Sequence, residues 1–273
     1  QPAITLAGKQ LEEFIGLKLL DRTTRQVSTT AEGENFIPIA QRLVRDFDTA
    51  IYDLRATAER RSGHVSMAIV PSVASNLLPD IIKAFSSEYP GIHLHLDDDS
   101  SQGVQRRVER NEVDFGIASL WKPNKSLDFK PLFADKLELI CHADHHLAKE
   151  TGPVRIDELE DTTFLDTGIT KTLRSRESFG DSKFDFPNIT TLLAMLRANL
   201  GVSVLPSLAI PALADNLVSR PLTPTQAREV YLITRNGWTV SPAAEAMIET
   251  IIRETPSQIK KHDLTLRTNS ASN

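Results

Sequence analysis

Apolar residues recur with three different patterns along the chain, and each pattern predicts a different part of the fold. In residues 2–15 they stand at helical spacing, and Gly16 follows as a natural helix end. Two short segments that resemble strands, at 17–20 and 26–28, flank a polar turn. Residues 1–30 are therefore expected to form a helix followed by two short strands.

A seven-residue repeat dominates the next segment, which begins after Thr30, a residue suited to cap a helix. The positions of this repeat step by four and three residues in turn: Phe36, Ala40, Leu43, Phe47, Ala50, Leu54 and Thr57. A seam of this length favours packing against a partner helix. We expect residues 31–62 to form a linker helix that makes a homodimer, with a surface helix packed on its own domain as the alternative.

After residue 63, short apolar runs typical of strands alternate with amphipathic stretches typical of helices. Strands are expected at 65–70, 92–96, 113–118, 137–141, 163–165, 202–205 and 230–234, and helices at 76–88, 103–111, 171–179, 189–199 and 242–254. This alternation predicts an α/β fold with a largely parallel sheet. Since the second half repeats the order of the first, we expect two lobes with a crevice at the carboxyl ends of their strands.

Composition places the chain among ordinary globular proteins. It has 273 residues, of which 40% are hydrophobic and 25% charged, and this length predicts about two domains. The single cysteine, Cys141, cannot form an internal disulfide, and the start of the chain has no secretion signal pattern. The longest apolar stretch, residues 200–214, is interrupted by Pro206 and Pro211. We therefore expect a cytoplasmic protein.

Charge is unevenly distributed between the head and the body of the chain. The net charge of −5 argues against non-specific binding of nucleic acid by the whole surface. Residues 1–30 have the opposite sign, because four basic residues outweigh three acidic ones: Lys9, Lys18, Arg22 and Arg25 against Glu12, Glu13 and Asp21. The head therefore allows a local contact with an anion.

Motifs for catalysis or metal binding are weak. The sequence has neither a nucleophile elbow nor a glycine-rich phosphate loop, so we expect no enzyme and no cofactor. His142, His145 and His146 suggest a metal site, but no remote partner ligand is evident, and a loop is expected instead. The acidic run 97–99 is expected to be a solvated loop, because three consecutive side chains do not face one point.

Several motifs occur in an order that identifies a family. The head carries Gln1-Pro2-Ala3-Ile4-Thr5, Leu19-Leu20-Asp21-Arg22-Thr23-Thr24-Arg25 and Thr30-Ala31-Glu32-Gly33, and the body carries Tyr89-Pro90-Gly91-Ile92, Val113-Asp114-Phe115-Gly116-Ile117 and Leu200-Gly201-Val202. Together these motifs resemble the LysR-type transcriptional regulators. Members of that family have two further helices before the Gln-Pro pair, so the resemblance implies an N-terminally incomplete chain.

The resemblance implies a complete domain plan. Residues 1–30 would be the second half of a winged helix-turn-helix, and 31–62 the dimerisation helix. Residues 63–255 would form an effector-binding domain of two Rossmann-like α/β subdomains, of the type 2 periplasmic-binding-protein kind. Lobe I would span about 63–136 and 229–255, lobe II about 137–228, and 256–273 a flexible tail. Expected partners are promoter DNA, a small-molecule effector, further copies in a homodimer or homotetramer, and RNA polymerase.

The alternative function is that of a transporter's solute-binding protein, which has the same two-lobed body. The missing secretion signal and the heptad seam oppose this alternative.

The resemblance also implies which residues contact DNA. Carried onto this chain, these residues are Pro2, Ala3, Thr5, Lys9 and Gln10 of the recognition helix, and Arg22, Thr23 and Arg25 of the wing. Thr5 and Gln10 can contact bases or phosphates, and Ala3 can touch a thymine methyl. Lys9 and the wing arginines suit phosphates. Leu6 stands where the family usually has a polar or basic residue, and Gly8 stands at an apolar core position.

Effector-binding residues are expected where predicted strands end at the crevice. Hydroxyl groups and backbone N–H groups at helix starts there would bind a carboxylate, and many inducers of the family are small organic anions. The candidates are Ser72, Val73, Ser100 and Ser101 in lobe I, and Thr170, Lys171, Thr172, Thr190 and Val202 in lobe II.

Overall fold

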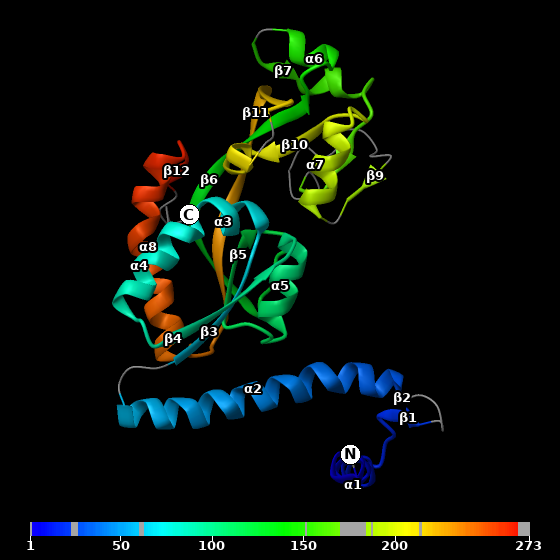
Figure 1. Ribbon diagram of the computed structural model, residues 1–273, viewed down its shortest axis with the longest axis vertical. Helices are drawn as coiled ribbons and strands as arrows, with labels where there is room; N and C mark the ends of the chain where they lie inside the picture. Colours follow the sequence, from blue (N-terminus) through cyan, green and yellow to red (C-terminus); the bar gives the residue numbers. More distant parts are fainter. Residues whose placement is uncertain are drawn as a thin grey trace. The chain divides into compact units, whose positions relative to one another are not determined.

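The computed structural model describes residues 2–22, 27–59, 63–150, 152–169, 184–186, 188–212 and 215–266. Contacts within the chain group its residues into two units, Gln1–Arg60 and Arg61–Asn273. Figure 1 shows the helices and strands of both units, which are described separately below.

The first unit has the element order that the sequence predicts. Helix α1 (Pro2–Ile15) is followed by strands β1 (Leu20–Arg22) and β2 (Val27–Thr29), which pair antiparallel, and by helix α2 (Ala31–Glu59). The paired strands β1 and β2 are called the wing below. Glu12 of α1 contacts the start of the wing, because its Oε1 accepts hydrogen bonds from the backbone N–H groups of Leu19 and Leu20, both at 2.9 Å.

A hydroxyl cap and a glycine fix the start of α2. Thr30 Oγ1 accepts from the Gly33 N–H at 3.0 Å and donates to the Lys18 carbonyl at 2.8 Å, so the predicted N-cap is present. A side chain at position 33 would place its Cβ 2.1 Å from the carbonyl oxygen of Leu19. Only glycine therefore allows α2 to approach the wing this closely.

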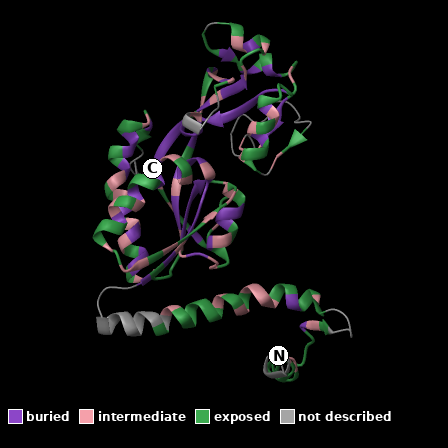
Figure 2. Ribbon diagram, viewed as in Figure 1, coloured by how far each residue is buried: buried purple, intermediate pink, exposed green. Residues whose placement is uncertain are grey.

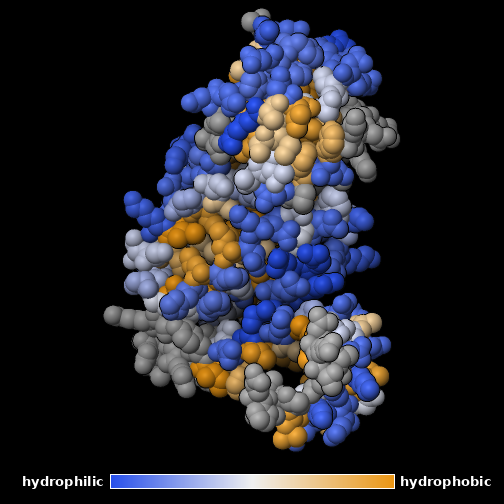
Figure 3. All heavy atoms as spheres, turned by 45° about the vertical axis from the view of Figure 1, so that its right-hand side comes forward, coloured by the Kyte–Doolittle hydropathy of each residue, from blue (hydrophilic) through white to orange (hydrophobic). Residues whose placement is uncertain are grey.

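The heptad seam of α2 is exposed at its middle positions. Leu43 is 55% and Phe47 65% exposed, whereas Phe36 and Ala40 are partly buried. Exposed positions (green in Figure 2) predominate along the described part of α2, and hydrophobic residues (orange in Figure 3) lie on the surface of the first unit. The side chains of Ala50, Leu54 and Thr57 lie outside the described set.

The second unit is built on one mixed sheet, with strand order β10-β6-β11-β5-β3-β4. Strands β3 (Gly63–Ile69), β4 (Ile92–Asp98) and β5 (Phe115–Ser119) are parallel. Strands β6 (Leu127–His142), β10 (Ser203–Pro206) and β11 (Leu217–Arg235) pair antiparallel. The expected α/β architecture is confirmed, but the expectation of a largely parallel sheet is wrong. Two long strands that return through both lobes impose the antiparallel pairs.

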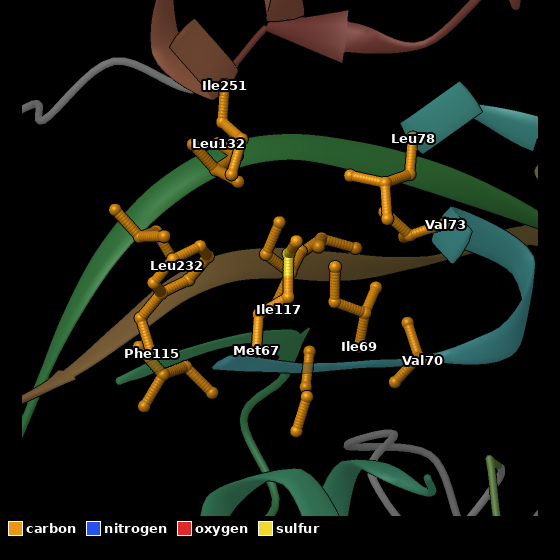
Figure 4. Close-up of a cluster of buried hydrophobic side chains, with 14 of the residues drawn as sticks. Met67, Ile69, Val70, Val73, Leu78, Phe115, Ile117, Leu132, Leu232 and Ile251 are labelled. Atoms are coloured by element: carbon orange, nitrogen blue, oxygen red, sulfur yellow. The ribbon is translucent and has the colours of Figure 1, made fainter. Parts of the chain in front are cut away.

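Lobe I has the larger core, between the sheet and the helices that cover it. These helices are α3 (Pro71–Asn76), α4 (Leu78–Glu88), α5 (Ser101–Glu109) and α8 (Pro242–Lys261). Figure 4 shows Met67 and Ile69 of β3, Ile117 of β5 and Leu232 of β11 inside this core, with Ile251 of α8 beside Leu132 of β6. The alternation of strand and helix in the sequence follows from this layering.

Lobe II is assembled from short elements around the far ends of β6 and β11. They are α6 (His146–Lys149), β7 (Val154–Arg155), the 3-10 helix η1 (Ile156–Leu159), β8 (Leu165–Asp166), β9 (Phe184–Asp185), α7 (Ile189–Arg197) and the 3-10 helix η4 (Ser207–Ala212). Two smaller apolar clusters form its core. The helix predicted at 171–179 lies outside the described residues.

The lobes meet where β6 and β11 change partners. Leu137 pairs with Gln226 and Glu138 with Pro221, so residues 222–225 are left out of the ladder at this point. Leu222 and Thr223 pair instead with β7. The two strands therefore form a double crossing, at which the chain passes from one lobe to the other.

The expectation of a flexible tail from residue 256 is wrong for 256–266. Helix α8 continues through Pro256 to Lys261, and β12 (Thr265–Leu266) pairs with β6. Ile259 and Leu264 are buried, so apolar burial holds a segment whose composition is mostly polar. Residues 267–273 lie outside the described set. No described helix combines the length and the hydropathy needed to cross a membrane.

Candidate functional site

A cavity of about 490 Å³ lies between the two lobes. Lobe I contributes the segments that follow β3, β4 and β5, and lobe II contributes the ends of β9 and β10 and the start of α7. The described residues that line it are Val70, Pro71, Ser72, Asp98, Asp99, Ser100, Ser101, Gln102, Trp121, Thr167, Gly168, Ile169, Asp185, Phe186, Asn188, Ile189, Thr190, Leu205, Pro206 and Arg228. Its size suits a small organic molecule.

Parallel strands place the polar groups of the lobe I wall. Because β3, β4 and β5 run in the same direction, their carboxyl ends meet at one edge of the sheet. Ser72 stands at the start of α3 there, and Ser100 caps α5 by accepting from the Gly103 N–H at 3.2 Å. Gln105 fixes the backbone at Trp121, because its Oε1 accepts a hydrogen bond from the backbone N–H of Trp121 at 2.6 Å.

The lobe II wall is built around the start of α7. Asn188 caps this helix, and its Oδ1 accepts from the Thr190 N–H at 2.7 Å. Ile169, Phe186, Leu205 and Pro206 supply apolar surface beside it. The wall therefore combines a helix start with an apolar surface, as ligand sites usually do.

Arg228 is the positively charged group among the described lining residues. Its side chain is only 4% exposed and is paired with Asp135, which is fully buried. Arg228 Nη2 donates to Asp135 Oδ2 at 2.8 Å and to Ser72 Oγ at 2.6 Å, and Nε donates to Asp135 Oδ2 at 3.2 Å. The two residues are direct neighbours across β11 and β6, and of the pair Arg228 lines the cavity.

Three carboxylates also line the cavity, from Asp98, Asp99 and Asp185. Asp99 is neutralised by Arg107, whose Nε lies 3.1 Å from Asp99 Oδ2. Burial, together with the charge of Asp97, raises the pKa of Asp98. The wall is therefore not uniformly suited to an anion, and it also offers acceptors for hydroxyl or amino groups.

The effector residues predicted from the sequence divide into three groups. Ser72, Ser100, Ser101 and Thr190 line the cavity. Val73 and Val202 are fully buried in the apolar clusters of lobes I and II and are not among the described lining residues, because each packs inward from its strand or helix end. Thr170, Lys171 and Thr172 lie outside the described residues.

Sequence reasoning missed Arg228, Trp121 and Asp98. Asp98 ends a predicted strand, so the rule that ligands bind at strand ends could have included it. Trp121 could have been found in the same way, as the second residue after β5. Arg228 stands before a predicted strand, and only the register of β6 and β11 shows that it reaches the cavity.

The predicted DNA-binding residues lie on α1 and the wing. Lys9 and Gln10 are exposed on α1. Pro2, Ala3 and Thr5 belong to the same helix and Arg22 to β1, but their side chains are not described. Thr23 and Arg25 lie outside the described residues.

The histidine cluster and the cysteine have structural roles. His142 Nδ1 accepts from the Asp144 N–H at 3.1 Å, and His145 caps α6 by accepting from the Leu147 N–H at 3.3 Å. Within the part of the chain that the structure describes, no group of three metal-binding side chains converges. Cys141 is fully buried, and this burial raises the pKa of its thiol, which disfavours a reactive thiolate.

Comparison with known proteins matches this chain to one family model and to relatives in sequence. The model of the LysR substrate binding domain matches residues 58–256. The uncharacterized HTH-type transcriptional regulator YbhD of Escherichia coli strain K12 is 31% identical over 264 residues, which is 92% of this chain and 82% of that protein.

Two solved structures share the fold. The LysR-family regulator CbnR in complex with its target DNA has a TM-score of 0.72 at 18% identity, over 93% of this chain and 90% of that one. The effector binding domain of QuiR in complex with shikimate has a TM-score of 0.63 at 16% identity, over 72% of this chain and 98% of that one.

Proposed function

We propose, from the premise that this chain belongs to the LysR family of transcriptional regulators, that it controls transcription through a carboxylate effector held in the cavity between its lobes. The observation that carries this proposal is the cavity itself. Its walls include the starts of α5 and α7, with the hydroxyls of Ser100, Ser101 and Thr190, and its lining includes a buried guanidinium. Such groups bind a small organic anion.

The proposed DNA interface is the exposed face of α1 together with the wing. Lys9 and Gln10 are exposed there, and Pro2, Ala3 and Thr5 share the helix. In this proposal the helix lies in the major groove, and Arg22, Thr23 and Arg25 contact phosphates beside it. The neighbour CbnR, solved with its target DNA, supports a DNA-binding role for this arrangement of domains.

The proposed dimer forms through α2 of two copies. Its exposed Leu43 and Phe47 belong to a seam that repeats every seven residues, the pattern of a helix that packs on another helix. Two heads joined in this way could contact two half-sites on promoter DNA. Assembly into a homotetramer, contact with RNA polymerase and action in the cytoplasm complete the proposal.

The proposed effector is a small carboxylate that also carries hydroxyl or amino groups. Arg228 and the helix starts would bind the carboxylate, and Asp98 would accept a hydrogen bond from a donor on the same molecule. The neighbouring QuiR domain holds shikimate, which is a hydroxylated carboxylate.

Regulation fits better than transport or catalysis. The relative YbhD carries the name of a transcriptional regulator, and the matching family model belongs to the same class of proteins. Cysteine-based sensing is disfavoured, because Cys141 is fully buried.

The DNA part of the proposal can be tested with the product of the complete reading frame. A duplex is enriched from a random-sequence library, and its dissociation constant is measured between 50 and 200 mM salt, a range chosen from the usual salt dependence of such complexes. Arg25→Ala should weaken binding and flatten the slope of log K against log salt by about 0.9 for each phosphate that the variant no longer neutralises.

Lys149→Ala serves as the matched control, since it removes one exposed positive charge from α6 of the second unit. An unchanged slope in Arg25→Ala would rule out the wing contact. Failure to enrich any duplex would contradict the proposed function itself.

A further inference from the structure

We propose that the buried Arg228–Asp135 pair senses the effector: Arg228 binds its carboxylate, and Asp135 transmits the event to the segment that joins the lobes. This inference rests on the proposed function and assigns its ligand contact to residues that the sequence motifs did not indicate. The pair lies at the double crossing of β6 and β11, two positions from the register shift between them.

The hydrogen bonds of Arg228 leave one nitrogen available. A guanidinium has five N–H donors, distributed over three nitrogens. Nε donates to Asp135, and Nη2 donates to Asp135 and Ser72. Within the described part of the chain, no acceptor lies within hydrogen-bond distance of Nη1. Arg228 lines the cavity, and we assign Nη1, which makes no hydrogen bond within the described residues, as its donor to a carboxylate bound there.

Asp135 uses its second oxygen to hold the start of η4. Its Oδ1 accepts from Ser207 Oγ at 2.7 Å and from the Leu208 N–H at 3.3 Å, while its Oδ2 accepts from Arg228. Both carboxylate oxygens are therefore occupied, one by the cavity arginine and one by η4. A displacement of Arg228 would therefore pull on Asp135 and, through its Oδ1, on the start of η4.

Helix η4 connects the cores of the two lobes. Leu208 is buried in the apolar cluster of lobe I, and Ala209 is buried in a cluster of lobe II. The chain enters η4 directly from β10 of lobe II, and η4 packs against α3, which carries Ser72. The path Ser72–Arg228–Asp135–Ser207 therefore runs from the lobe I wall of the cavity to the junction of the lobes.

A purely structural role is the competing explanation for the pair. Removing one partner would leave the other charge buried and could unfold the lobe, so single substitutions do not separate the explanations. The double variant Arg228→Met/Asp135→Leu removes both charges and keeps similar volume, which buried pairs often tolerate. The matched control is Arg253→Met/Glu88→Leu, which removes an exposed arginine–carboxylate pair of 2.8 Å from lobe I.

Binding is measured with defined probes on the full chain. Acetate, succinate, benzoate and salicylate are each titrated beside their carboxamides, and the melting temperature and the dissociation constant are recorded. Wild type and the control double variant should bind at least one carboxylate more tightly than its amide. The Arg228→Met/Asp135→Leu variant should bind that carboxylate about tenfold to a hundredfold more weakly, the range for removal of a charge-assisted hydrogen bond.

Ser207→Ala tests transmission separately from binding. This variant should bind the carboxylate with an affinity close to that of wild type, but the carboxylate should alter its affinity for the selected duplex less than it does in wild type. Equal responses of wild type and Ser207→Ala would overturn the transmission half of the inference.

The remaining outcomes separate this inference from the proposed function. The inference is overturned if no carboxylate binds better than its amide, or if the Arg228→Met/Asp135→Leu variant binds it as well as wild type does. A protein that binds its selected duplex but binds no carboxylate better than its amide keeps the proposed DNA-binding role and loses both the carboxylate effector and this inference.

Discussion

Helices α2 and α8 both carry apolar stripes at helical spacing, but among the described residues the stripe of α8 is covered and the middle of the α2 stripe is exposed. In α8, Met247 and Ile251 are fully buried against lobe I. In α2, Leu43 and Phe47 remain exposed. Periodicity therefore shows that a helix face needs a partner surface, but not whether that surface belongs to the same chain.

Because of this difference, the two stripes contribute to different free energies, one to that of unfolding and the other to that of association. The stripe of α8 contributes to the unfolding free energy of the second unit, because the sheet of lobe I covers it. The stripe of α2 contributes to association, if a second copy covers it. Substitutions in the two helices should therefore change different measured quantities.

The largest expected effect is on α8. Ile251→Ala should lower the unfolding free energy of the chain by about 2–5 kcal/mol, because it leaves a cavity beside Leu132. Urea unfolding measures this change, with Arg253→Ala on an exposed position of the same helix as the control. Equal stability of the two variants would contradict the burial of α8 in solution.

The next effect concerns α2 and association. Phe47→Ala should weaken dimer formation by about 1–2 kcal/mol per subunit, as for a side chain at a helix interface, and leave the unfolding of the second unit unchanged. Sedimentation equilibrium measures the first quantity and urea unfolding the second. Arg45→Ala, also exposed on α2, is the control. If the Phe47→Ala protein dimerises as wild type does, α2 is not the dimer contact.

The smallest effect concerns the end of α8, which is tied to α4. Lys261 Nζ lies 2.7 Å from Asp80 Oδ2, and this hydrogen bond and charge lower the pKa of Asp80. A lowered folded-state pKa stabilises the protein above about pH 3.9, the usual value of an unfolded aspartate, and this stability is lost as pH falls through the lowered value.

Asp80→Asn should therefore reduce the melting temperature slightly at pH 7, and the difference from wild type should vanish in strong acid. A difference that persists at low pH would show that Asp80 acts by some means other than its charge.

Local sequence patterns predicted many of the helices and strands, because whether a segment becomes a helix or a strand depends largely on the spacing of neighbouring residues. The seam of α2, the cap at Thr30 and the strands β3, β4 and β5 followed from spacing. The antiparallel sheet and the ordered segment 256–266 did not, because both depend on pairing with β6 from distant parts of the chain.

The cavity shows the same division between local and distant contacts. Ser72 and Ser100 were predicted because each stands where a strand ends and a helix begins, and Thr190 was predicted as part of the wall of the second lobe. Arg228 was missed because its role depends on a partner 93 positions earlier, Asp135, and on the register between two strands. No spacing rule in a single sequence contains that information.

The central claim is that an effector in the second unit controls DNA binding by the first. The most direct test is the dissociation constant of the full protein for its selected duplex, with and without a saturating amount of the probe carboxylate that most raises the melting temperature. The account predicts a change of about 5-fold to 150-fold, the usual range of coupling between two sites. The same dissociation constant in both conditions would contradict it.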